Sequence, residues 1–102
     1  MFEDWPSEFD RPCRTELARP RPVTIDLAQM LAPQRHRPAS LPMRVRAGGL
    51  VFSGDVDGVL LAWARTSQGA WLGYVELTVT TANGHGTIEL RQWVSSGALR
   101  PR

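Results

Sequence analysis

Residues 71–94 read WLGYVELTVTTANGHGTIELRQWV, and this stretch decides the fold class. Apolar and polar residues alternate on both sides of Asn83-Gly84, the pair most favoured in a two-residue type I′ hairpin loop. A loop centred there pairs Val79 with Ile88 and Leu77 with Leu90 on one face, and Thr78 with Glu89, Glu76 with Arg91 and Tyr74 with Trp93 on the other. Because one face is apolar and the other has an opposite-charge pair and an aromatic pair, the register is self-consistent.

A second hairpin is expected just before the first. Residues 58–65 form its first strand, residues 66–69 the turn and residues 70–80 the next strand. This turn places Leu60 opposite Val75 and Ala64 opposite Trp71 on the core side, with Trp63 opposite Leu72 and Leu61 opposite Tyr74 on the other side. Residues 43–47 are expected to form an additional, earlier strand.

Proline and glycine divide the chain into two halves. Seven of the eight prolines lie in residues 1–42, and all nine glycines lie from Gly48 onward. Since proline lacks an amide donor and fixes φ, the proline-rich half is not expected to hold a central strand. We therefore predict an extended N-terminal arm over residues 1–42 and a β-barrel over residues 43–102.

One short helix is expected inside the arm, at about residues 24–31. Thr24 is a reasonable N-cap, Asp26 suits the first turn, and Pro33 ends the segment. Two turns are too short to be stable alone in water, so this helix must pack on another surface.

The end of the chain adds a resemblance to a known fold. Residues 92–101, QWVSSGALRP, are similar to the strand, single 3₁₀ turn and short last strand that end an SH3-like barrel. Residues 69–75, GAWLGYV, resemble the aromatic-rich middle strand of such barrels. Ser95 stands where the peptide-binding members have proline, so the resemblance implies the fold and not a ligand. We expect a mainly β fold: a small SH3-like barrel with a proline- and arginine-rich N-terminal arm carrying one short helix.

An apolar patch is expected on the outside of this barrel. Its members are Leu61, Trp63, Leu72, Tyr74 and Trp93. Exposed patches of this kind usually mark interaction sites. Three interpretations are open. The arm covers the patch through Ile25, Leu27, Met30 and Leu31, a larger protein partner or a second copy of the chain binds it, or it forms an aromatic ligand cage.

The first ten residues, MFEDWPSEFD, interleave three aromatic residues with four acids. Phe2, Trp5 and Phe9 have the spacing of anchors on a helix that lies in a groove, although an extended docking peptide fits equally well. The competing interpretation is a frayed acidic terminus.

Basic charge is concentrated in the next segment. Residues 11–46 carry eight of the twelve arginines, at Arg11, Arg14, Arg19, Arg21, Arg35, Arg37, Arg44 and Arg46. Arginine pairs well with phosphate, so nucleic acid is an alternative partner. The segment has no interleaved aromatic residues to stack bases, which favours a soluble linker or contact with an acidic protein surface.

Catalytic and metal-binding motifs are not found in the sequence. There is one cysteine, Cys13, and the two histidines have no ligand-like neighbours, so we expect no metal, no cofactor and no enzyme activity. The first residues do not resemble a signal peptide, and no apolar run is long enough for a membrane helix, so a cytoplasmic location without membrane contact is expected. Twelve arginines and no lysine suggest a high-GC bacterium or its phage as the source. The expected function is that of a non-catalytic adaptor which docks onto a larger bacterial or phage assembly.

Overall fold

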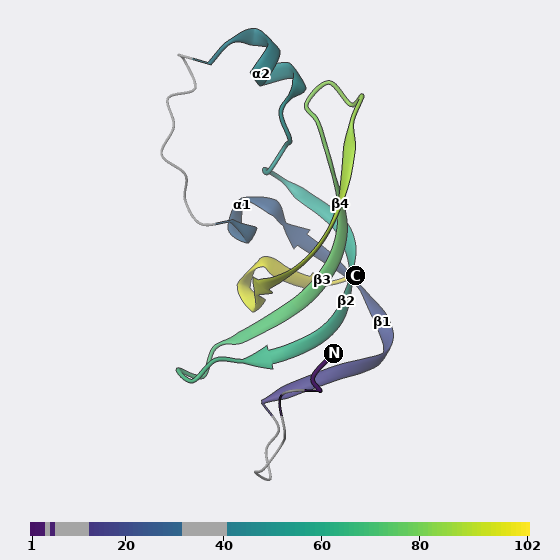
Figure 1. The fold of residues 1–102 in the computed structure, drawn as a ribbon, viewed down its shortest axis with the longest axis vertical. Coiled ribbons are helices and arrows are strands. Elements are labelled where there is room, and N and C mark those ends of the chain that lie inside the picture. The colour runs from purple at the N-terminus through teal and green to yellow at the C-terminus, as the bar shows by residue number, and fades with distance from the viewer. Residues whose placement is uncertain (4, 6–12, 32–40) are drawn as a thin grey trace.

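The computed structural model describes residues 1–3, 5, 13–31 and 41–102. It has a mainly β fold, as predicted, in which five antiparallel strands form one curled sheet in the order β4-β3-β2-β1-β5, a half-barrel (Figure 1). The strands are β1 (Arg14–Asp26), β2 (Asp55–Arg65), β3 (Trp71–Thr80), β4 (Thr87–Ser95) and β5 (Leu99–Pro101). Two short helices, α1 (Leu27–Met30) and α2 (Met43–Gly48), and the 3₁₀ turn η2 (Ser96–Ala98) complete the described elements.

The β3–β4 hairpin has the predicted register. All five predicted pairs occur: Val79–Ile88, Leu77–Leu90, Thr78–Glu89, Glu76–Arg91 and Tyr74–Trp93. The predicted type I′ loop is wrong, because Gly84 has a positive φ of 76° and Asn83 does not. The amide of Thr81 donates to the carbonyl of Gly86 at 2.9 Å, which leaves four residues in the loop. The longer loop has the same centre as the predicted one, so the register is unchanged.

The β2–β3 hairpin departs from the predicted register. Its loop is closed by Thr66 and Ala70, whose backbone groups bond at 2.8 Å, and Gly69 takes a positive φ of 92°. This three-residue loop shifts the neighbouring pairs by one residue, so that Ala64 pairs with Leu72 and Trp63 with Gly73. An irregularity between Leu60 and Ala62 then restores the predicted pair of Leu60 and Val75. The other three predicted pairs, Ala64–Trp71, Trp63–Leu72 and Leu61–Tyr74, are therefore wrong.

Strand β1 corrects the prediction that the proline-rich segment holds no central strand. It lies between β2 and β5 in the sheet. Only its end, Val23 to Ile25, pairs with β5, whereas Pro20 lies in the stretch where the pairing with β2 is irregular and Pro22 pairs with Val59 of β2. Pro20 and Pro22, which lack an amide hydrogen, therefore lie largely where β1 pairs with β2 only and has no β5 partner. A sheet tolerates proline at such an edge position.

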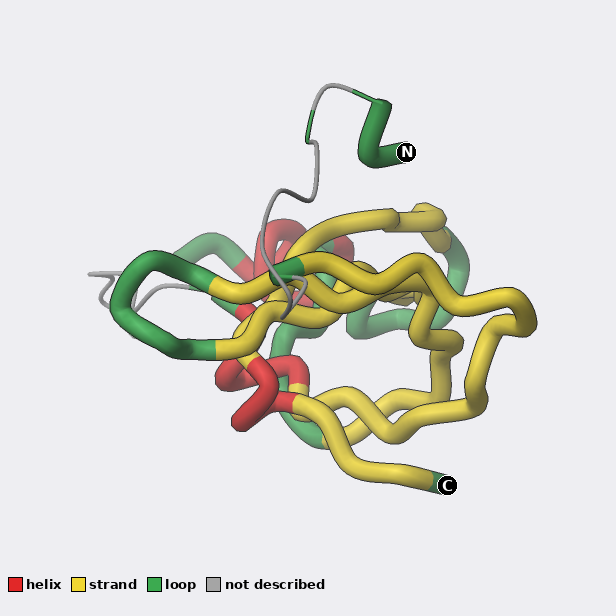
Figure 2. The backbone as a smooth tube through the Cα atoms, turned by 90° about the horizontal axis from the view of Figure 1, so that it is seen from below, coloured by secondary structure: helices red, strands yellow, loops and turns green. Residues whose placement is uncertain are grey.

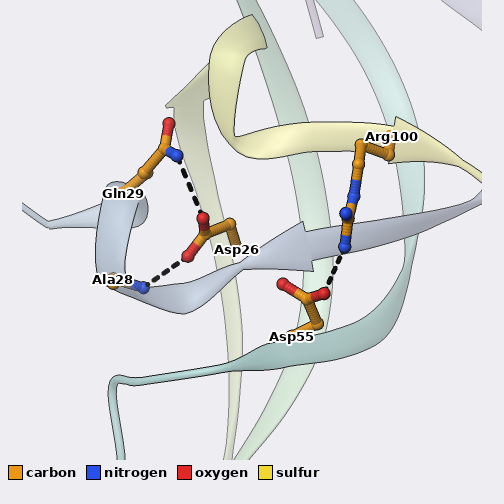
Figure 3. A network of polar contacts seen from close by, with 5 residues as sticks. All are labelled: Asp26, Ala28, Gln29, Asp55 and Arg100. Carbon is orange, nitrogen blue, oxygen red and sulfur yellow. Dashed lines mark hydrogen bonds and ion pairs between the residues drawn. The ribbon is translucent and has the colours of Figure 1, made fainter.

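Both helices differ from the predicted elements. Thr24 and Ile25 continue β1, so α1 begins only after Asp26, whose carboxylate accepts hydrogen bonds from the Ala28 amide at 3.1 Å and the Gln29 side chain at 3.0 Å (Figure 3). An Asp26 cap of this kind satisfies an amide that the first helical turn leaves unpaired. The strand predicted for residues 43–47 is wrong, because that segment forms α2.

The hydrophobic core fills the concave side of the curled sheet, here called the inner face. Its fully buried members include Ile25, Val75 and Val79. Seen from below in Figure 2, the strands curl around this interior, and the N-terminal residues lie outside it. The ion pair of Arg100 with Asp55 links β5 to the start of β2 (Figure 3). No helix in the described ranges has the length and apolar character needed to span a membrane.

Candidate protein-binding surface

The irregularity at Leu61 divides the predicted aromatic patch between the two faces of the sheet. Trp63 is paired with Gly73, whose strand neighbour Val75 is in the core, so Trp63 lies on the inner face and packs against the core. Leu72, Tyr74 and Trp93 remain on the opposite side, here called the outer face. The half-buried Leu61 sits at the irregularity itself. The prediction that all five residues share one outer patch is wrong for Trp63.

The N-terminal residues join the outer group instead. The ring of Phe2 lies 6.1 Å from that of Trp93 and 5.5 Å from that of Trp5. Trp93 in turn lies 5.0 Å from Tyr74, its cross-strand partner. Four rings thus follow one another, in the order Trp5, Phe2, Trp93 and Tyr74. With Leu72 they make up what we call the outer aromatic surface.

Arg14 holds the N-terminal residues against the sheet. Its guanidinium carbon lies 5.5 Å from the centre of the Phe2 ring, and its Nε donates to the carbonyl oxygen of Trp5. The register explains its position, because Arg14 pairs with Ala64 at the edge of the outer aromatic surface. A cation over an aromatic ring contributes roughly 0.5–1 kcal/mol at an exposed site.

A second charged contact shapes the N-terminal segment. The Met1 ammonium donates a hydrogen bond to Glu3. This hydrogen bond lowers the pKa of the Glu3 carboxyl, and the same contact raises the pKa of the ammonium. Both groups are exposed to water, so the contact orients the segment without contributing appreciably to stability.

The N-terminal residues cover the outer aromatic surface only in part, and the rest of it is exposed to solvent. Trp5 is 38% exposed and Trp93 is 37% exposed, and a hollow of about 490 Å³ lies between the N-terminal residues and the sheet. Each aromatic contact contributes roughly 0.5–1.5 kcal/mol, whereas ordering the backbone costs roughly 1–2 kcal/mol per residue. For a segment of five residues the cost of ordering the backbone, roughly 5–10 kcal/mol, exceeds the roughly 1–3 kcal/mol from the two ring contacts of Phe2, so the N-terminal segment is held weakly.

The inner face has an aromatic group of its own. Trp63 and Trp71 meet edge to face with ring centres 6.4 Å apart, and they line a cleft of about 360 Å³ with Thr15 and Ser96. Arg65 already occupies one face of Trp71, with its guanidinium carbon 5.4 Å from the ring centre. Trp71 was not among the predicted site residues, because the expected four-residue turn placed it on the core side.

The N-terminal arm covers the outer aromatic surface, but with different residues from the predicted ones. Ile25, Leu27 and Met30 are buried in the core on the inner face, and Leu31 is exposed. The cover comes instead from Phe2 and Trp5, at the predicted acidic-aromatic tip. Its third aromatic residue, Phe9, lies outside the described residues. The contribution of Arg14 to this surface had no sequence signal, because it depends on the pairing of β1 with β2.

The described arginines of the predicted basic segment lie in two separate places. Arg14, Arg19 and Arg21 belong to β1, whereas Arg44 and Arg46 belong to α2. Arg14 lies beside the β2–β3 loop, and α2 contacts the β3–β4 loop through the Asn83 amide and the Ala47 carbonyl. The two loops lie at opposite ends of β3. Because β3 has ten residues, each about 3.3 Å long in a strand, the loops are roughly 30 Å apart. Arg11, Arg35 and Arg37 lie outside the described residues, and the nucleic-acid alternative stays a prediction.

Among the described residues, no group of three or more histidine, cysteine or acidic side chains is arranged to hold a metal ion. Comparison of the chain with protein-family models, with curated proteins and with solved structures finds no match.

Proposed function

We propose that this protein is a non-catalytic protein-binding module that docks onto a larger assembly through its outer aromatic surface. The observation that carries the proposal is the series of rings from Trp5 through Phe2 and Trp93 to Tyr74, in which the two tryptophans stay more than a third exposed. Tryptophan and tyrosine are the residues most often found as energetic anchors at protein interfaces.

The surroundings of these rings support a protein partner. The hollow of about 490 Å³ is lined by Leu72 and Ala64 together with the aromatic rings, so it can accept a large apolar side chain. Arg14, whose guanidinium lies over the Phe2 ring, offers a charged group at the border of this hollow. An apolar centre with a charged border is the usual composition of a protein interface.

An SH3-like barrel is part of the same proposal. It is supported by the curled antiparallel sheet and by the 3₁₀ turn η2 that joins β4 to the short last strand β5. We further propose, from the composition, a cytoplasmic setting in a high-GC bacterium or its phage.

Two matched tryptophans test the proposal. Trp93 is 37% exposed on the outer face and Trp71 is 36% exposed on the inner face. The full-length protein, Trp93→Ala, Trp5→Ala and Trp71→Ala are each used as bait in extracts of the source cells, and bound proteins are quantified by mass spectrometry. We expect a partner that Trp93→Ala loses and Trp71→Ala retains, with affinity falling by about 2 kcal/mol, or roughly thirtyfold, for an anchor residue of the sheet. Trp5→Ala, which removes only a ring of the N-terminal segment that covers the sheet, is expected to retain the partner.

Thermal melts of the four proteins accompany this experiment. They separate loss of binding from loss of folding, because Trp93 also packs on Tyr74. Equal recovery of the same partners by Trp93→Ala and Trp71→Ala, with all baits folded, contradicts the proposed function.

A further inference from the structure

The described N-terminal residues, 1–3 and 5, present two aromatic rings together at a turn. The amide of Trp5 donates to the carbonyl of Phe2 at 3.0 Å, which closes the turn three residues apart. The two rings meet edge to face at an interplanar angle of 86°. A phenylalanine and a tryptophan at this spacing, with acids between them, therefore form a self-contained recognition element.

Among the described residues, side chains of the sheet contact this turn. The Trp93 ring contacts Phe2, and the guanidinium of Arg14 contacts both Phe2 and Trp5. Phe2 and Trp5 do not belong to any strand of the sheet. None of these contacts depends on the covalent link between the turn and β1, so a turn of the same chemistry on another chain can make all of them.

Charge complementarity indicates what kind of chain that is. Residues 1–10 carry four acids and no arginine, a net charge of −4. The sheet presents the Arg14 guanidinium to the turn, over the Phe2 ring and against the Trp5 carbonyl. Opposite charges of this kind favour encounter with the correct partner and disfavour a basic one.

We propose that the sheet surface around Trp93 and Arg14 binds an acidic segment of a partner protein that carries a Phe-x-x-Trp turn. Phe2 and Trp5 of this chain occupy the same site internally. The inference rests on the proposed function and names its partner class. The internal turn competes with the ligand at an effective concentration on the order of millimolar, as expected for a short linker. Because its own docking is weak, it lowers the apparent affinity for the ligand without closing the site.

A peptide of this chain serves as the probe. The synthetic peptide MFEDWPSEFD, labelled with a fluorophore, is titrated by anisotropy against the full-length protein and against the full-length double variant Phe2→Ala/Trp5→Ala. The double variant keeps the chain length and removes only the two competing rings. We expect saturable binding to both proteins, about tenfold tighter for the double variant, and weaker binding at high salt.

Three further variants, each made in the double-variant background, locate the site. Trp93→Ala and Arg14→Gln remove the two groups that contact the turn and are expected to abolish or strongly weaken peptide binding. Trp71→Ala is the matched control on the inner face and is expected to leave binding unchanged. A control peptide with alanine in place of both its phenylalanine at position 2 and its tryptophan is expected not to bind.

Several results would overturn the proposal. They are the absence of saturable peptide binding to the double variant, equal affinities of the wild type and the double variant, or binding that survives Trp93→Ala in a folded protein. A concentration-dependent dimer that requires both Phe2 and Trp93 assigns the site to a second copy and also overturns it.

The two proposals fail separately. A natural partner that is lost with Trp93→Ala but is not displaced by the peptide overturns this inference and leaves the proposed function standing. Peptide binding at Trp93 without any partner that depends on Trp93 overturns the proposed function and supports the recognition of acidic Phe-x-x-Trp turns.

Discussion

The two hairpins of the sheet share strand β3 but differ in regularity. On the β4 side, nine consecutive residue pairs run from Leu72–Ser95 to Thr80–Thr87 without interruption. On the β2 side, the pairing shifts between Leu60 and Ala62, and on the far side of β2 the pairing with β1 shifts again between Glu16 and Arg21. The same short stretch of β2 is therefore irregular against both of its neighbours.

This difference has a direct functional consequence. A one-residue shift of register exchanges the faces of every side chain that follows. Trp63 consequently lies on the inner face near the core, and the alanines of β2 lie under the outer aromatic surface, where Ala64 leaves room beside Trp93. A regular β2 would place the large Trp63 side chain where the N-terminal turn now sits.

The largest expected effect compares the two sides by the same substitution. Ile25 of β1 is fully buried, whereas Ile88 of β4 is 41% exposed. Ile25→Ala is expected to lower the free energy of unfolding by about 3 kcal/mol, within the usual 2–5 kcal/mol for deleting a buried isoleucine side chain. Ile88→Ala is expected to cost less than about 1 kcal/mol. Chemical denaturation measures both values.

Equal losses for the two isoleucine variants would break the comparison. They would mean that β1 does not contribute to the core more than the regular hairpin does. If Ile25→Ala lowers the free energy of unfolding by less than about 1 kcal/mol, residues 14–26 do not pack into the core as a strand of the sheet.

The regular hairpin could be predicted because its register is a local property. Alternation and a centred turn signal fix the pairs, and replacing the expected loop by a longer one about the same centre changes none of them. The β2–β3 register was predictable only in part, because a shorter loop and the irregularity at Leu61 cancel each other at Leu60–Val75. No residue type between Leu60 and Ala62 signals such an irregularity.

Strand β1 was not predictable from its own composition. Pro20 and Pro22 argue against a strand, and only the position of β5, which pairs with Val23 to Ile25, makes them acceptable. The outer aromatic surface was anticipated at Leu72, Tyr74 and Trp93 and at the tip residues Phe2 and Trp5. Arg14 contacts the tip residues beside these rings, and its position follows from the tertiary pairing of β1 with β2.

The next effect in size tests the irregularity itself. Trp63 packs against the core, so Trp63→Ala is expected to lower the free energy of unfolding by about 2 kcal/mol. Trp93→Ala on the outer face is expected to cost about 1 kcal/mol or less through the lost ring contacts with Tyr74 and Phe2. In a sheet with a regular β2, both tryptophans would share the outer face. If denaturation experiments show equal losses of unfolding free energy for the two tryptophan variants, the register assigned to β2 is contradicted.

The smallest effect concerns the loop of the regular hairpin, where two glycines offer a matched pair. An added methyl group meets no atom within 4 Å at Gly84 or at Gly48, so any difference between the two alanine variants comes from the backbone. Gly84 has a φ of 76°, which disfavours residues with a Cβ, whereas Gly48 ends α2 without a positive φ. Gly84→Ala is expected to lower the free energy of unfolding by about 1 kcal/mol, and Gly48→Ala to leave it unchanged or to raise it by up to about 1 kcal/mol. Thermal melts of the two variants distinguish them, because only Gly84→Ala is expected to lower the melting temperature. A stabilised Gly84→Ala would show that the loop does not need its left-handed residue, and the four-residue loop that keeps this hairpin in register would then have a different geometry.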